Sequence, residues 1–239
     1  MTHASRTVFL GLTISVAAVC AQTFPADPYR CYPARNATPV ADSVVLRDAL
    51  DPLNGEAADI RATVRFCGPV EQSYHGSKTE IIDAEARQAM YLLSPRSVPV
   101  RSVTVGNQFG TSTLVVQSPT TLAASSWLTG SGPASADNYQ CYNAGGGAVE
   151  QRWGLRDDSY RGSHQVLFPM LFCAAAEVEH AGVVVPPRFP EVHQTCYSIT
   201  KAHDRFEAAV VTDNLFGQQE MTLISGDLIC APTLILGVQ

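Results

Sequence analysis

The chain has 239 residues and a formal net charge of −6, with 46% apolar and 16% charged residues. This apolar content is sufficient for a folded core and excludes a disordered chain. Lysine is confined to Lys78 and Lys201, and a net-negative surface repels phosphate backbones, so we expect no nucleic-acid partner.

Residues 1–21 are typical of a signal peptide. Arg6 precedes a short apolar run at 8–19, and small residues precede a predicted cut after Ala21. A membrane span needs about 20 apolar residues, more than this run holds. Removal of Arg6 would leave 15 basic and 22 acidic residues, a net charge of −7. A lipid anchor on Cys20 and a buried N-terminal strand or helix are the alternatives; we expect a secreted or cell-surface protein with no membrane span.

The following segments predict short β-strands, because most are rich in β-branched residues and many are separated by Gly, Pro, Asn or Asp. In chain order the strands are Ser43–Leu46, Ile60–Phe66, Val100–Val105, Ser112–Val116, His164–Phe168, Gly182–Val185, Ala208–Thr212 and Glu220–Ile224. Ile60–Phe66 alternates between apolar and polar residues, as a half-buried strand does. Asn107–Gly110 and Asn214–Gly217 each predict a hairpin turn between two such strands.

Two segments between the strands have other compositions. Thr79–Ala89 begins with a capping threonine and early acids, which predicts a helix; a long hairpin loop is the alternative. Thr129–Ala136 is small, polar and rich in glycine and proline, which is typical of a linker.

The chain repeats itself. Asp27–Tyr32 matches Asp137–Tyr142 at an offset of 110, and Asn107–Gly110 matches Asn214–Gly217 at an offset of 107. Several landmarks thus agree on a period near 108 residues, which indicates an internal duplication. Each half holds two shorter units, and three of the four units open with Cys-Tyr and close with a second cysteine.

The second unit predicts how the cysteines pair. It has Met90 before Tyr91 and Ala123 at the closing position, so both of its cysteines are missing together. Joint loss is expected if the two bond to each other, because an orphan thiol is a liability in an exported protein. Each predicted bridge closes a loop of about 35 residues, worth about 3–4 kcal/mol. The predicted bridges are Cys31–Cys67, Cys141–Cys173 and Cys196–Cys230.

These motifs resemble a family of tandem repeats in secreted bacterial proteins, a domain of unknown function. Its units carry a His-x-x-Cys-Tyr opening, an Asn/Asp-Gln-Phe-Gly turn and a closing cysteine followed by proline. The fourth unit fits best, with His193, Cys196, Asn214–Gly217, Cys230 and Pro232. The first and third units depart from the family at the turn. The resemblance covers most of the mature chain and implies no activity.

The sequence therefore predicts an all-β fold stapled by disulfides, with two tandem β-sandwich-like domains that arose by duplication. The first domain is expected at 22–128 and the second at 137–239, with the linker at 129–136 between them. Each domain would contain two repeat units, because a single unit of about 45 residues would be marginal alone.

No motif predicts a catalytic residue, a metal or a cofactor. Ser131 has flanking glycines at the wrong spacing for a nucleophile elbow. Glu177, Glu179 and His180 cluster without a second histidine at metal-ligand spacing, which favours solvated surface charge. Carboxylates near turns permit calcium, but ordinary turn chemistry explains them more simply. These carboxylates are Asp48, Asp51, Asp157, Asp158 and Asp213.

The leading hypothesis is a secreted, non-enzymatic structural or interaction module for cell-surface assembly or adhesion, whose partners are itself or other surface proteins. The alternative is a secreted hydrolase or carbohydrate-binding protein with a dispersed site. An enzyme needs titratable groups that converge in a pocket. A scaffold needs an exposed strand edge or an apolar patch.

Overall fold

The computed structural model describes residues 24–133, 135–200 and 206–239, without the side chains of 52–54 and 56. The predicted signal peptide and Cys20 lie outside the described residues. Within them the chain forms strands and turns and no helix, so the predicted all-β class is confirmed.

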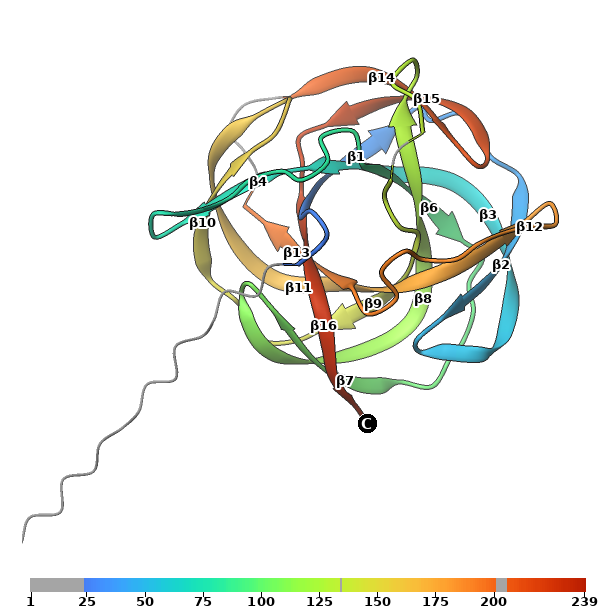
Figure 1. The fold of residues 1–239 in the computed structure, drawn as a ribbon, viewed down its shortest axis with the longest axis horizontal. Helices are drawn as coiled ribbons and strands as arrows, with labels where there is room; N and C mark the ends of the chain where they lie inside the picture. The colour runs from blue at the N-terminus through green and yellow to red at the C-terminus, as the bar shows by residue number, and fades with distance from the viewer. Residues whose placement is uncertain (1–23, 134, 201–205) are drawn as a thin grey trace, which may run out of the picture.

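Eight strands form the inner part of the structure, and all of their pairings are antiparallel (Figure 1). They are β1 (Tyr29–Arg35), β3 (Asp51–Pro69), β6 (Arg87–Leu93), β8 (Gly110–Leu128), β9 (Tyr139–Gly145), β11 (Arg161–His180), β13 (His193–Ile199) and β16 (Leu228–Val238). Each pairs with the next in this order, and β16 pairs with β1. The inner strands therefore close into a ring, which removes their free edges.

The other strands of the described chain lie outside this ring, mostly as hairpins. They are β2 (Asp42–Asp48), β4 (Glu71–Tyr74), β5 (Ser77–Thr79), β7 (Arg101–Asn107), β10 (Gln151–Arg156), β12 (Val183–Val185), β14 (Glu207–Asn214) and β15 (Gly217–Ile224). Several pair with a distant part of the chain: β2 with β11, β4 with β10, β7 with β16 and β14 with β8.

The sheet continues across the predicted linker. Residues 129–136 lie between β8 and β9, which are direct neighbours in the ring. Strands of 22–128 and 137–239 therefore complete each other's pairing in one large sheet, rather than forming two sheets of their own. The division into two domains and the origin by duplication stay predictions.

Alternation along the inner strands explains the Cys-Tyr motif. Successive side chains of a strand point to opposite faces. Cys31, Cys141 and Cys196 pack together inside the ring, in one buried cluster with their bonded partners. The tyrosine after each cysteine points outward and packs under the outer hairpins; these residues are Tyr32, Tyr142 and Tyr197.

The three disulfides join cross-strand neighbours of adjacent inner strands. The bonded pairs are Cys31–Cys67, Cys141–Cys173 and Cys196–Cys230, the same pairs that the sequence predicts. Met90 of β6 lies opposite Ala123 of β8 in the corresponding register, inside the same cluster. An apolar pair therefore occupies the place of a fourth bridge.

The predicted helix at Thr79–Ala89 is wrong. Residues 80–86 form a loop, and β6 begins at Arg87. The Asp27 carboxylate accepts the backbone N–H groups of Ile82 and Asp83 at 2.7 and 2.8 Å. These bonds hold the loop against the start of β1, and the pairing of β6 with both β3 and β8 outweighs the local helix preference.

The predicted strands all fall within or across observed strands, and both hairpin turns are present. Gly110 and Gly217 adopt the positive φ that these turns require. Ile60–Phe66 differs in detail, because register shifts on either side of Ala62–Thr63 interrupt its alternation. As a result Thr63, expected on the polar side, is buried, whereas Ala62 is only half-buried.

The register predicts that a fourth disulfide can be built at the unbridged place. The double substitution Met90→Cys and Ala123→Cys should form a bridge on oxidative refolding and raise the free energy of unfolding by about 3–4 kcal/mol. Peptide mass spectrometry and denaturant titration measure the two effects. Met90→Cys alone is the control and should not stabilise. Free thiols at 90 and 123 after oxidation would contradict the register.

Candidate functional site

Four tyrosine hydroxyls connect the inner ring to the turns of the outer hairpins. Each tyrosine stands at the outward position of its unit, and each partner is an Asp or Asn at a hairpin turn far away in the sequence. Every link therefore joins two separate units of the chain. The links are Tyr32–Asp157 at 2.5 Å, Tyr91–Asn214 at 2.6 Å, Tyr142–Asp48 at 2.7 Å and Tyr197–Asn107 at 2.9 Å.

Each turn carboxylate in these links bonds both the backbone of its own turn and a tyrosine hydroxyl. Asp48 Oδ1 accepts the backbone N–H groups of Leu50 and Asp51, while Oδ2 accepts the Tyr142 hydroxyl. Asp157 does the same for its own turn and for Tyr32. The predicted turn chemistry is thus present at both carboxylates. The sequence did not predict the tyrosine links.

The two Asp links and the two Asn links have opposite polarity. At Asp48 and Asp157 the tyrosine donates to a carboxylate, whereas Asn107 and Asn214 donate their amide N–H to the tyrosine oxygen. Burial raises the pKa of Asp48, and the hydroxyl of Tyr142 partly offsets this. Burial also raises the pKa of Tyr142, and the neighbouring Asp48 raises it further.

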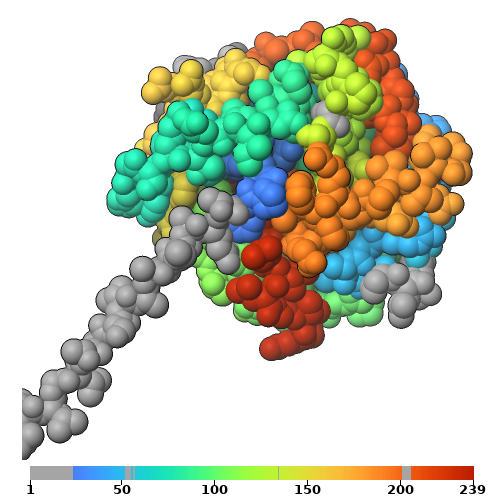
Figure 2. Space-filling view, viewed as in Figure 1, coloured from blue at the N-terminus to red at the C-terminus, as the bar shows by residue number. Residues whose placement is uncertain are grey.

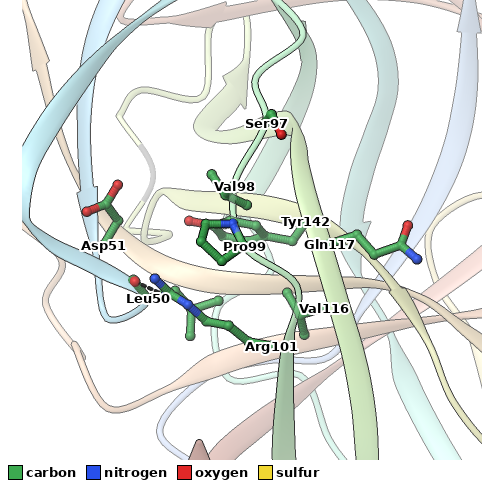
Figure 3. A pocket seen from close by; sticks show the side chains of 9 residues that line it. All are labelled: Leu50, Asp51, Ser97, Val98, Pro99, Arg101, Val116, Gln117 and Tyr142. Carbon is green, nitrogen blue, oxygen red and sulfur yellow. Dashed lines mark hydrogen bonds between the residues drawn. The ribbon is translucent and has the colours of Figure 1, made fainter. Parts of the chain in front are cut away.

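A hollow of about 210 Å³ opens beside the Tyr142–Asp48 link (Figure 3). It lies between the turn after β2, the loop before β7 and the strand β8. Figure 3 shows Val98 and Pro99 beside the ring of Tyr142, with Arg101 reaching toward Leu50. The lining residues are Leu50, Asp51, Ser97, Val98, Pro99, Arg101, Val116, Gln117 and Tyr142.

Three polar side chains that line this hollow, Asp51, Arg101 and Tyr142, are engaged with the protein. Arg101 Nη1 donates to the carbonyl of Leu50, Arg96 Nη2 contacts Asp51 Oδ2 at 3.5 Å, and Tyr142 bonds Asp48. These contacts fix the turn after β2. None of these three contacts pairs a nucleophile with a general base, the arrangement that covalent acyl transfer uses.

A second hollow, of about 190 Å³, lies where the repeated Asp-x-Tyr-x-Cys-Tyr motifs begin. Asp27 and Asp137 line it together with Tyr29 and Tyr139. Asp137 accepts the backbone N–H groups of Arg188 and Phe189 at 2.7 and 3.0 Å, just as Asp27 fixes residues 82 and 83. The motif aspartates therefore hold the two crossover loops.

The other sequence candidates are distributed over the surface. Glu177 and Glu179 both bind Arg47, and His180 bonds Asp42 at 2.7 Å, so this cluster is paired surface charge. Ser131 donates to the carbonyl of Leu128 in its own turn. Across the described ranges, no three His, Cys, Asp or Glu side chains are grouped so as to hold a metal ion.

No family model, curated protein or solved structure matches this chain. The resemblance to the tandem-repeat family therefore stays a prediction. In the part of the chain that is described, no helix has the length and apolar character needed to cross a membrane. The three disulfides indicate an oxidising environment.

The direction of the hydrogen bond between Tyr142 and Asp48 predicts how substitutions of these two residues affect stability. Tyr142→Phe should lower the free energy of unfolding by about 1.5–3 kcal/mol, because a buried carboxylate loses its donor. Asp48→Asn should cost less, since an asparagine there can donate to Tyr142 as Asn107 donates to Tyr197. Denaturant titration of both variants measures the difference. A larger loss for Asp48→Asn than for Tyr142→Phe would contradict the assignment.

A buried histidine predicts loss of stability in mild acid. His193 Nδ1 accepts the N–H of Ala175 at 3.1 Å, and burial lowers the His193 pKa from 6.5 to about 4. Between these values the unfolded chain binds the proton and the folded chain does not. The contribution of His193 to the free energy of unfolding is therefore complete above pH 6.5. It is lost as the pH falls toward 4, by about 3 kcal/mol at most. Burial lowers the pKa of His164 too, which adds in the same direction.

Denaturant titrations from pH 7.5 to 4 measure this dependence. His193→Asn keeps an acceptor for Ala175 and should flatten the slope, whereas His75→Asn, at an exposed turn, should leave it unchanged. Equal slopes in the wild type and His193→Asn would show that His193 does not cause the acid sensitivity.

Proposed function

We propose that this protein is a secreted, non-enzymatic structural module that assembles at a cell surface through the free edge of β12. The disulfide-stapled ring is suited to an oxidising exterior. The polar groups near the two described hollows hold turns and loops, which supports a scaffold more than a hydrolase. The observation that carries the proposal is the difference between β5 and β12, the two described strands that pair with one neighbour only.

Within the described chain, only β5 and β12 pair along one side alone. β5 carries Lys78 at its centre, which pairs with Glu71 at 2.7 Å. A lysine on an edge strand is a common protection against strand pairing. β12 consists of Val183, Val184 and Val185, all exposed and without a charge. One edge therefore carries a lysine, and the other carries no charge.

The hairpin of β11 and β12 presents this edge rigidly. Ala181 and Gly182 connect the two strands, and both adopt positive φ, which is the type I′ geometry that fits the twist of a hairpin. In Figure 1 the hairpin projects at the right of the molecule, beyond β2. The space-filling view shows the same segment, in orange, at the rim (Figure 2).

We propose that the occupant of this edge is β12 of a second copy. Three uncharged valines are self-complementary: in an antiparallel pair, Val184 lies on the twofold axis and Val183 of each copy faces Val185 of the other. Three residues bury far less than the roughly 1,200 Å² of a stable interface. Each contact is therefore weak, and assembly depends on many copies held on one surface.

A charged residue on the edge tests this proposal. Sedimentation of the full chain should show reversible self-association as the concentration approaches about 1 mM, the range of weak contacts. Val184→Lys should abolish it, because two lysines would meet at the twofold axis.

The matched control is Val100→Lys, which adds the same charge at another exposed valine outside the strands. It should associate like the wild type. A wild-type chain that stays monomeric throughout, or equal loss in both variants, would refute pairing through β12.

A further inference from the structure

We propose that the solvent face of β4, β10 and β11 is a binding site for a tetrahedral oxyanion, phosphate or sulfate, either free or as an ester. The site is independent of the β12 edge and of the function proposed for it. The lining residues surround a hollow of about 220 Å³. They are Glu71, Ser73, Gly154, Leu155, Arg156, Arg161, Gly162 and Ser163.

The register of the sheet places the polar residues of this site on one face. Gly154 of β10 lies between Ser73 of β4 and Ser163 of β11 in one row across the strands. Two residues along, Arg156 lies between Glu71 and Arg161. Rows that are two residues apart face the same side of a sheet. The intervening row has Gln72 and Leu155 buried on the opposite side.

The charges on this face are unbalanced. Arg156 and Arg161 lie directly opposite each other on neighbouring strands, an arrangement that is destabilising unless a counter-charge lies between them. Lys78 adds a third cation, since its Nζ lies 2.7 Å from Glu71 Oε2. Glu71 is the one carboxylate among these residues, and Arg156 Nη1 lies 4.0 Å from it.

The neighbouring acids offset only part of this charge. Glu80 Oε1 lies 3.4 Å from Lys78 Nζ, and the other acids are engaged elsewhere. Asp157 bonds Tyr32 and its own turn, and Asp158 pairs with Arg87 at 3.0 Å. Lys78 and then the two arginines lower the pKa of Glu71, which keeps this carboxylate ionised. Lys78, Arg156 and Arg161 therefore face two carboxylates, Glu71 and Glu80, which leaves one excess positive charge on a chain whose net charge is −6. This local excess is what attracts an anion.

The absence of a side chain at Gly154 lets a hydroxyl lie close to the backbone of β10. Gly154 has no side chain, and a Cβ at this position would collide with the Ser73 hydroxyl. Ser73 and Ser163 are exposed and flank the glycine, so their hydroxyls can donate to oxyanion oxygens. Guanidinium groups bind phosphate and sulfate oxygens through paired N–H donors. Two arginines, two hydroxyls and a hollow fit a tetrahedral anion better than a planar carboxylate.

The hairpin of β4 and β5 forms one side of the site and projects into solvent. It projects at the left of the view in Figure 1, beside β10, and the space-filling view shows it exposed there (Figure 2). His75 and Gly76 form its turn with positive φ at both positions. The type I′ turn fixes the position of Lys78 relative to Ser73, its partner across the hairpin.

The experiment is a titration of the full ¹⁵N-labelled chain with sodium sulfate, and separately with sodium phosphate, at constant ionic strength. Amide shifts should saturate on β4, β10 and β11. Arg156→Gln with Arg161→Gln should weaken binding at least 10-fold. The matched control, Arg35→Gln with Arg61→Gln, removes two exposed positive charges from β1 and β3 and should bind like the wild type.

Two further variants separate a shaped site from diffuse charge. Gly154→Ala leaves every charge in place but displaces the Ser73 hydroxyl, and should also weaken binding at least 10-fold. Glu71→Gln removes the competing carboxylate and should tighten binding several-fold. Thermal melting checks that each variant is folded.

A sulfated monosaccharide in place of the salts distinguishes an esterified ligand from a free anion, according to which binds more tightly. Absence of saturable shifts with all three probes would overturn the proposal. Equal weakening in the Arg35/Arg61 control would also overturn it, because binding would then follow net charge alone.

Discussion

Closure of the inner ring is the constraint on which the rest of this structure depends. The first described strand, β1, pairs with the last, β16, so the inner strands lose their free edges together. Closure also fixes which residues face inward. Because side chains alternate along a strand, the ring gathers every bonded cysteine into one buried layer and directs the following tyrosines outward.

The tyrosine links extend this constraint to the outer hairpins. A short hairpin on its own is marginal in water and needs a surface to pack on. Here a turn side chain of each of four hairpins bonds a tyrosine on an inner strand of another unit. Each link therefore fixes a hairpin to a part of the ring that is distant in the sequence. The hydrogen-bonding capacity of the Asp and Asn side chains is largely used in this way. That use explains why acids cluster at turns without forming a metal site among the described residues.

Two surface features take no part in these tyrosine links or in the inner ring's cysteine cluster. The valine edge of β12 and the cationic face of β4, β10 and β11 lie at different places on the outer part of the structure. Each involves a short outer hairpin with a type I′ turn, and none of the residues that line either surface belongs to the cysteine cluster. Changes at these surfaces therefore leave the inner ring intact. Surface loops and hairpins on a rigid scaffold are where binding properties usually reside.

The sequence by itself determined the class of the fold, the hairpin turns and the disulfide partners. These depend on local patterns: apolar residues and turn signals mark strands, Gly110 permits a positive φ, and the paired absence at Met90 and Ala123 identifies which cysteines bond. Each of these patterns extends over a few residues or over one repeat unit.

Only the tertiary structure decided how the halves combine. Backbone hydrogen bonds between strands depend little on which side chains the strands carry. The sequence therefore does not indicate that β1 pairs with β16 or β8 with β9. The helix expected at Thr79–Ala89 was wrong for the same reason, because β6 pairs with β3 on one side and with β8 on the other. The meeting of Lys78 with Arg156 and Arg161 likewise depends on register between segments about 80 residues apart. Long-range register decides such contacts, and local propensity does not encode it.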